Sequence, residues 1–191
     1  MNRALPLLFL ILTLPSLTAC GSFLRAIGSE PIEDDPGERT MGAQVEDESI
    51  ETKAKVNIAA ADAKLKAAHV VTVSYNGFVL IAGQVPDEAM KKKAAEVVRE
   101  IRGVRRIYNE LEIAGNTAGM VRSSDAWITT KVKSGLLANE KIQSGRVKVV
   151  TENGVVYLMG LATQAEAERA ADVAADVDGV QRVVKLFEYI D

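Results

Sequence analysis

The sequence of 191 residues has one cysteine and one histidine, and this scarcity removes several classes of protein. One cysteine cannot close a disulfide within the chain, and Cys20 and His69 offer no ligand spacing that suits zinc. No nucleophile with an adjacent base and no glycine-rich phosphate loop stands out in the chain. The sequence therefore predicts that the protein is not an enzyme, with no catalytic residue, no metal and no cofactor.

Positive charge is not in excess either. Lysine and arginine total 23 against 26 acidic residues, which gives a formal net charge of −3. Nucleic-acid-binding domains usually carry a basic patch or a high isoelectric point. We therefore expect no nucleic-acid partner, although the hydrophobic and charged fractions, 48% and 26%, are those of an ordinary folded protein.

The N-terminus, "MNRALPLLFLILTLPSLTACGS", has the pattern of an export signal. Arg3 precedes an apolar run, 5–17, that is shorter than the roughly 20 residues a membrane-spanning helix needs. The run ends in Leu-Thr-Ala-Cys, which resembles a lipobox. We expect residues 1–19 to be a lipoprotein signal peptide and Cys20 to carry the palmitate and other acyl chains of the anchor. The alternative is an ordinary secretory signal with a stray cysteine near the cleavage site.

Two features follow the cysteine. Similarity to Gram-negative lipoproteins implies an outer-membrane destination, because Gly21 stands where an aspartate would favour the inner membrane. Residues 20–44 are rich in glycine, proline and acidic residues and show no apolar periodicity, so we expect them to form the lipidated cysteine and a flexible tether.

The rest of the chain repeats itself at an offset of about 77 residues. "DESIETKAKV" from Asp47 matches "DAWITTKVKS" from Asp125, and "YNGFVLIAG" matches "ENGVVYLMG". Further on, "AAEVVREIRGVRRI" matches "AADVAADVDGVQRV". An internal repeat of this length indicates two copies of one small domain.

Each copy predicts the element order α-β-β-α-β. A helix with apolar residues at helical spacing is followed by two strands around an Asn-Gly dipeptide, the strongest short-range hairpin signal. A second helix and a last strand complete the copy. The β-α-β portion implies a right-handed crossover, so we expect an α+β fold with a three-stranded mixed sheet covered by two helices.

The duplicated "NG.V.L.G" hairpin and the "A...A..V.GV..V" passage resemble the BON domain, and two such domains behind a lipobox resemble dual-BON-domain outer-membrane lipoproteins. We expect BON domain 1 at residues 45–114, a linker at 115–123 and BON domain 2 at 124–191. The linker is short, which favours packing of the two domains against each other.

The first helix of the second copy carries the only tryptophan of the chain, Trp127. Successive residues of a helix step by about 100°, which places three apolar residues on the core face and Trp127 on the opposite side. The core-face residues are Ile128, Val132 and Leu136. The first copy has Ser49 where the second has Trp127. The fold therefore does not require this aromatic side chain.

Lys131 and Lys133 lie near Trp127, and the helix has no acidic residue between Ala126 and Ala138. A tryptophan beside lysines suits a lipid headgroup layer. The resemblance implies binding of an anionic phospholipid, phosphatidylglycerol-like, through this helix, with Trp127, Ile128, Lys131, Ser134 and Leu137 as the matching residues. Gly135, a poor helix former, is expected to loosen the last turn of the helix.

The resemblance further implies a role in cell envelope integrity on the periplasmic face, enrichment at cell division sites and contact with the outer-membrane protein assembly machinery. One alternative is a protein-interaction module with Trp127 at an interface to that machinery. Another is that Trp127 packs against the first domain or the linker.

Overall fold

The computed structural model describes residues 37–116 and 119–191. The predicted signal peptide, Cys20 and most of the predicted tether lie outside the described residues. Within the described part of the chain, no helix is both long enough and apolar enough to cross a membrane.

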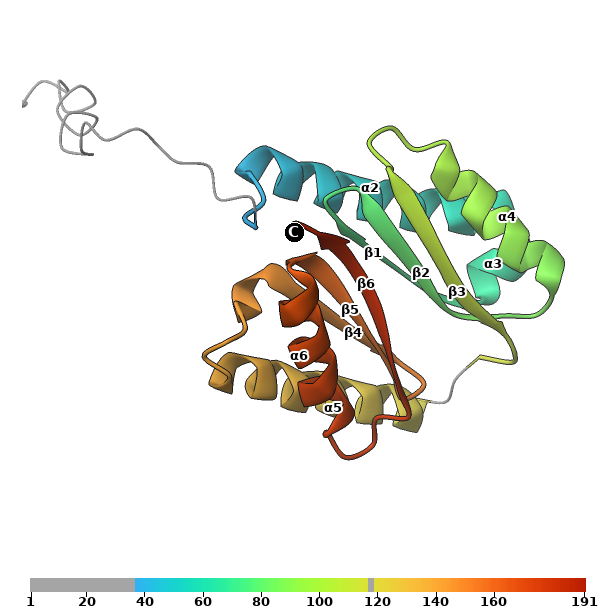
Figure 1. The fold of residues 1–191 in the computed structure, drawn as a ribbon. Helices are drawn as coiled ribbons and strands as arrows, with labels where there is room; N and C mark the ends of the chain where they lie inside the picture. The colour runs from blue at the N-terminus through green and yellow to red at the C-terminus, as the bar shows by residue number, and fades with distance from the viewer. Residues whose placement is uncertain (1–36, 117–118) are drawn as a thin grey trace, which may run out of the picture. The chain divides into compact units, whose positions relative to one another are not determined.

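The two copies form the predicted order α-β-β-α-β, and each adds one short element that was not predicted, α3 in the first and η1 in the second (Figure 1). The first domain contains α2 (Met41–Ala61), α3 (Ala63–Ala67), β1 (His69–Tyr75), β2 (Phe78–Val85), α4 (Glu88–Arg99) and β3 (Arg106–Ile113). The second contains α5 (Gly119–Ala138), the 3₁₀ turn η1 (Ser144–Arg146), β4 (Val147–Glu152), β5 (Val155–Ala162), α6 (Gln164–Ala175) and β6 (Arg182–Tyr189).

Each domain has one three-stranded mixed sheet, as predicted. The strand orders are β1-β2-β3 and β4-β5-β6, with the first pair antiparallel and the second pair parallel. Two-residue turns join the hairpins, and Asn76, Gly77, Asn153 and Gly154 all have positive φ. The Asn-Gly dipeptides therefore set the register of both sheets.

Both first helices begin earlier than expected. α2 begins at Met41, inside the segment expected as a tether, and α5 includes Gly119, inside the segment expected as a linker. The Thr40 hydroxyl caps α2 by accepting a hydrogen bond from the Ala43 amide at 3.1 Å. The first turns of both helices lack apolar residues at core-facing positions. The apolar spacing of the sequence therefore did not predict them.

The helices of each domain cover one face of its sheet (Figure 1). In the first domain, Ile50 and Ala54 of α2 and Ala94 of α4 pack on Val79 and Ile81 of β2. The second domain repeats this core, with contributions from α5, α6 and β5. The central strands β2 and β5 are buried along their whole length, so their other faces must also be covered.

The second faces of the two sheets pack against each other. Their side chains form a third buried cluster, which includes Leu80 and Phe78 from β2 and Tyr157, Met159 and Leu161 from β5. Burial raises the pKa of Tyr157 to about 12, and the nearby carboxylate of Glu110 adds to this shift. The packing of the two domains expected from the short linker is thus confirmed. Its apolar contacts come from the sheets, and Lys148 of β4 adds an ion pair with Glu51 of α2 at 2.7 Å.

Polar contacts at the edges of this interface follow the repeat. Asn76 donates to Glu188 at 2.6 Å, and its counterpart Asn153 donates to Glu112, the counterpart of Glu188, at 3.5 Å. Arg105 adds two hydrogen bonds to Glu188, at 2.9 and 2.6 Å. Equivalent residues exchange equivalent contacts, as in a two-fold symmetric dimer.

A glycine in each central strand permits close approach of the neighbouring strand. Gly83 has φ +117°, and a Cβ atom there would lie 2.1 Å from the carbonyl oxygen of His69. We expect Gly83→Ala to lower the free energy of unfolding by at least about 2 kcal/mol, because the added carbon meets backbone and the left-handed φ is strained. Urea unfolding followed by circular dichroism measures this change.

Gly115→Ala is the matched control for that substitution. A Cβ atom at Gly115 meets nothing within 4 Å. The control should unfold at the same urea concentration as the natural protein. Equal midpoints for the two variants would contradict the close approach at Gly83.

Candidate functional site

The outward face of α5 carries three large exposed apolar side chains. Met120, Trp127 and Leu137 are 86%, 63% and 76% exposed. The opposite face is committed to the core, where Ile128, Val132 and Leu136 are buried. α5 is therefore amphipathic, with one face packed in the core and the other exposed.

The residues predicted to bind lipid divide between these two faces. Trp127, Lys133, Ser134 and Leu137 are exposed, and Lys131 is half-buried. The Lys131 ammonium donates to the carbonyl oxygen of Asp178 at 2.8 Å, and the Ser134 hydroxyl donates to that of Thr130 at 3.0 Å. Four of the six predicted residues are thus exposed on α5, and Lys131 and Lys133 lie about 160° apart around the axis, on opposite flanks of Trp127.

Ile128 is the exception, and its inclusion is corrected. It is 3% exposed and belongs to the core of the second domain. It lies about 100° from Trp127 around the helix axis, on the same side as Val132. Ile128 therefore supports the helix from beneath and is not available to a ligand.

Trp127 does not take part in the contact between the domains. The third buried cluster is made by strand residues, and the exposed Trp127 is not a member of it. The helices lie on the faces of the sheets that point away from this interface. The alternative in which Trp127 joins the domains does not agree with this arrangement.

Met120 is a further candidate for the exposed face of α5, and it was not predicted from the sequence. It precedes Trp127 by seven residues, or about two turns, so the two side chains lie on one stripe of α5. The i, i+7 spacing was available as a signal, but residue 120 fell within the segment expected as a linker. Including Met120 lengthens the exposed apolar stripe by two turns.

Charge on the outward face of α5 has one sign. Asp125 is the only acidic residue from Gly119 to Ala138, and it is 5% exposed. Its carboxylate accepts hydrogen bonds from the backbone amides of Asn153 and Gly154, both at 2.9 Å. Because the acid points into the domain, the exposed face presents lysines without a neighbouring carboxylate on the same helix.

Asp47 makes the same contact in the first domain, with two additions. It accepts from Ser74, Asn76 and Gly77 at 2.6, 2.7 and 2.9 Å, and Arg39 donates to it at 2.6 Å. Burial raises the pKa of Asp47, but the hydrogen bonds from Ser74, Gly77, Asn76 and Arg39 outweigh burial and hold it below its ordinary value. In both domains, a buried aspartate thus ties the first helix to the Asn-Gly turn.

Gly135 has a packing role that the sequence did not reveal. A Cβ atom there would lie 2.9 Å from Val173 of α6. The glycine therefore allows α5 and α6 to approach closely. The helix continues through it to Ala138, so the loosened last turn expected at this position is not seen.

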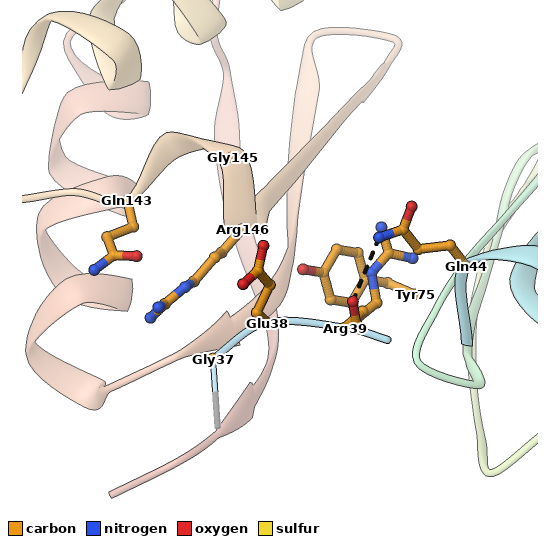
Figure 2. Close-up of a pocket in the computed structure, with 8 residues that line it drawn as sticks. All are labelled: Gly37, Glu38, Arg39, Gln44, Tyr75, Gln143, Gly145 and Arg146. Atoms are coloured by element: carbon orange, nitrogen blue, oxygen red, sulfur yellow. Dashed lines mark hydrogen bonds between the residues drawn. The ribbon is translucent and has the colours of Figure 1, made fainter. Parts of the chain in front are cut away.

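A hollow lies where the described chain enters the first domain (Figure 2). It is a cavity of about 270 Å³ whose lining includes Arg39, Gln44, Tyr75, Gln143 and Arg146. Figure 2 shows Arg39 beside the ring of Tyr75, with its guanidinium carbon 3.7 Å from the ring centroid. Arg39 also pairs with Asp47, so this arginine is already engaged in fixing the start of α2.

The chain belongs to the family of BON-domain proteins. The family model, described as BON domain, matches residues 46–115 and 124–191, which are the two copies of the repeat.

Two similar proteins are 42% identical to this chain over 154 residues. One is Outer membrane lipoprotein DolP of Haemophilus influenzae, with 80% of this chain and 79% of that protein covered. The other is a 21 kDa hemolysin of Actinobacillus pleuropneumoniae, with 80% and 78% covered. Osmotically-inducible protein Y of Escherichia coli is 28% identical over 183 residues, covering 91% of this chain and 90% of that protein.

Proposed function

We propose that this protein is a non-enzymatic outer-membrane lipoprotein that binds anionic phospholipid through the outward face of α5. One observation carries the proposal. The side chain of Trp127 is 63% exposed, and it lies on a helix face that has no exposed acidic residue. The similarity to Outer membrane lipoprotein DolP supports the location, and the cysteine at position 20 supports a lipid anchor. From the family resemblance we further propose a role in envelope integrity, at division sites and beside the assembly machinery for outer-membrane proteins.

The physical basis is an interfacial contact. An indole ring prefers the boundary between headgroups and acyl chains, and each lysine near an anionic surface contributes about 1 kcal/mol. Lys131 and Lys133 together contribute about 2 kcal/mol on this scale. Contact of this strength is enough for a tethered protein, because the anchor keeps α5 at high local concentration near the membrane.

A vesicle flotation experiment tests the proposal. The fragment 37–191 is suitable because it retains Arg39 and the complete α2, which a fragment beginning at residue 45 would lose. We expect binding to vesicles containing phosphatidylglycerol, little binding to phosphatidylcholine, and at least about tenfold weaker binding for Trp127→Glu.

Val56→Glu is the matched control. Val56 is 59% exposed on α2, the equivalent helix of the first domain. The same change of apolar side chain to acid there should leave vesicle binding within about twofold. If both variants lost binding equally, net charge rather than the α5 face would explain it. If the natural fragment showed no preference for anionic vesicles, the proposal would be wrong and the alternative, a protein interface at Trp127, would stand.

Lys133→Gln should produce a smaller and salt-dependent loss. Lys133 is exposed and flanks the stripe. Losing one lysine costs about 1 kcal/mol, or roughly a fivefold change in the partition coefficient. Flotation at low and high salt measures it, and the difference between variant and natural fragment should shrink at high salt because counterions screen the interaction. A loss independent of salt would point to a packing role for Lys133 instead.

A further inference from the structure

The first domain has a groove at the position that Trp127 occupies in the second. The groove has a volume of about 330 Å³ and lies between α2 and the turn that follows α4. Gly42, Val45, Glu46, Ser49, Lys53 and Arg102 line it over the buried Ile50. Ser49 is the counterpart of Trp127, so a small hydroxyl stands where the second copy has its largest side chain.

The repeat also explains why the groove stays open. In the second domain Lys131 donates to the carbonyl of Asp178 and bridges α5 to the following turn. The counterparts in the first domain are Lys53 and Arg102, two cations that repel each other. Across residues 37–116 and 119–191, neither of these two side chains has an ion-pair or hydrogen-bond partner.

Val45 lines the groove with the two cations, and further exposed apolar side chains lie on α2. Met41, Val45 and Val56 of α2 are 83%, 66% and 59% exposed. Residues 41, 45 and 56 lie within about 80° of Ser49 around the helix axis, so they form one stripe along the groove. The surface therefore combines unpaired positive charge with apolar contact area, which suits a ligand that has an anionic group beside an apolar one.

The acidic residues of α2 distinguish among such ligands. Glu46 and Glu48 are exposed on the same helix, whereas the corresponding positions of α5 hold Ser124 and Ala126. A continuous anionic surface would bring many negative charges against these carboxylates and would be repelled. A single carboxylate seated between Lys53 and Arg102 meets one acid, Glu46, which also lines the groove, and two cations outweigh it.

We propose that this groove is a docking site for a polypeptide partner, which inserts an aspartate or glutamate beside an apolar side chain. The carboxylate pairs with Lys53 and Arg102, and the apolar side chain packs on Val45 over Ile50. The site is on a different domain from the lipid-binding face of α5 and does not depend on it. The protein would thus hold a membrane with its second domain and a protein with its first.

Selection from a displayed library of random peptides tests this proposal. The full mature chain, held in detergent micelles, is the target, and Lys53→Glu/Arg102→Glu serves for counter-selection. We expect the peptides that prefer the natural protein to be enriched in an acidic residue next to an apolar one. A synthetic copy of such a peptide should bind the double variant at least about tenfold more weakly, which corresponds to about 1.4 kcal/mol.

Three controls define the outcomes. Lys92→Glu changes an exposed lysine of α4 and should leave peptide binding unchanged, as should Trp127→Glu. Lys53→Gln/Arg102→Gln, which adds no acid, should also weaken binding if the groove is the site. Peptides that bind natural protein and double variant equally, or that lack acidic enrichment, would overturn the proposal. Binding of phosphatidylglycerol vesicles that depends on Lys53 and Arg102 would assign the groove to lipid and overturn the polypeptide partner.

Discussion

Leu80→Asp is expected to separate the two domains. Leu80 is fully buried in the cluster between the sheets, where Tyr157 and Met159 come from the other domain. An aspartate there would be a charge without a partner, and breaking the interface to hydrate it is the less costly outcome. We expect a loss of about 4 kcal/mol or more in the stability of the assembled pair.

The separation has a distinctive signature. Each domain keeps its own core between helices and sheet, because those residues form clusters separate from the interface. Urea unfolding should therefore change from one transition to two, and amides of β2 and β5 should exchange faster with solvent. Ile113→Asp, at a 56% exposed position of β3, is the control and should keep one transition. One unchanged transition for Leu80→Asp would contradict the interface.

Asp47→Asn is expected to lower the free energy of unfolding by about 3 kcal/mol, because an amide cannot accept all the hydrogen bonds that the carboxylate receives. The amides of Asn76 and Gly77 and the hydroxyl of Ser74 would compete for one oxygen. Asp125→Asn, with two such bonds, should lose about 2 kcal/mol. Glu48→Gln, exposed on the same helix as Asp47, should change stability by less than about 0.5 kcal/mol.

The effect of Asp47 should depend on pH in a defined direction. Its pKa in the folded state is lowered from an ordinary value of 3.8, so its contribution is fully present above that value. The contribution is lost as the pH falls through the lower, folded-state pKa. The stability difference between the natural protein and Asp47→Asn should therefore be constant near neutral pH and shrink below about pH 4. A difference that persisted unchanged at low pH would show that shape rather than charge matters at this position.

The fold was predictable because its strongest signals are local and occur twice. The Asn-Gly dipeptides set both hairpins, and the helical spacing of Ile128, Val132 and Leu136 identified the core face of α5. The exposed position of Trp127 followed from the same helical spacing. The helical spacing also placed Ile128 on the core face, so the inclusion of Ile128 in the site rested on the family resemblance alone.

The contacts between distant segments were not predictable in this way. Nothing local shows that the carboxylate of Asp125 reaches the turn at Asn153, although an aspartate recurs at Asp47 in the other copy. The sheet-to-sheet interface did leave a signal. The continuous apolar runs 78–83 and 155–162 are typical of strands buried on both faces, whereas a strand with one exposed face alternates. Which surface covers the second face still depends on long-range packing.

The fluorescence of Trp127 tests the central claim most directly, because it is the only tryptophan in the chain. In the free fragment 37–191 the indole is 63% exposed, so we expect emission typical of a solvated ring. Vesicles containing phosphatidylglycerol should shift the emission to the blue, and lipids brominated along the acyl chains should quench it. Phosphatidylcholine vesicles should do neither. An emission spectrum that stays unchanged with anionic vesicles, or that shifts equally with both lipids, would contradict recognition of anionic phospholipid by this face of α5.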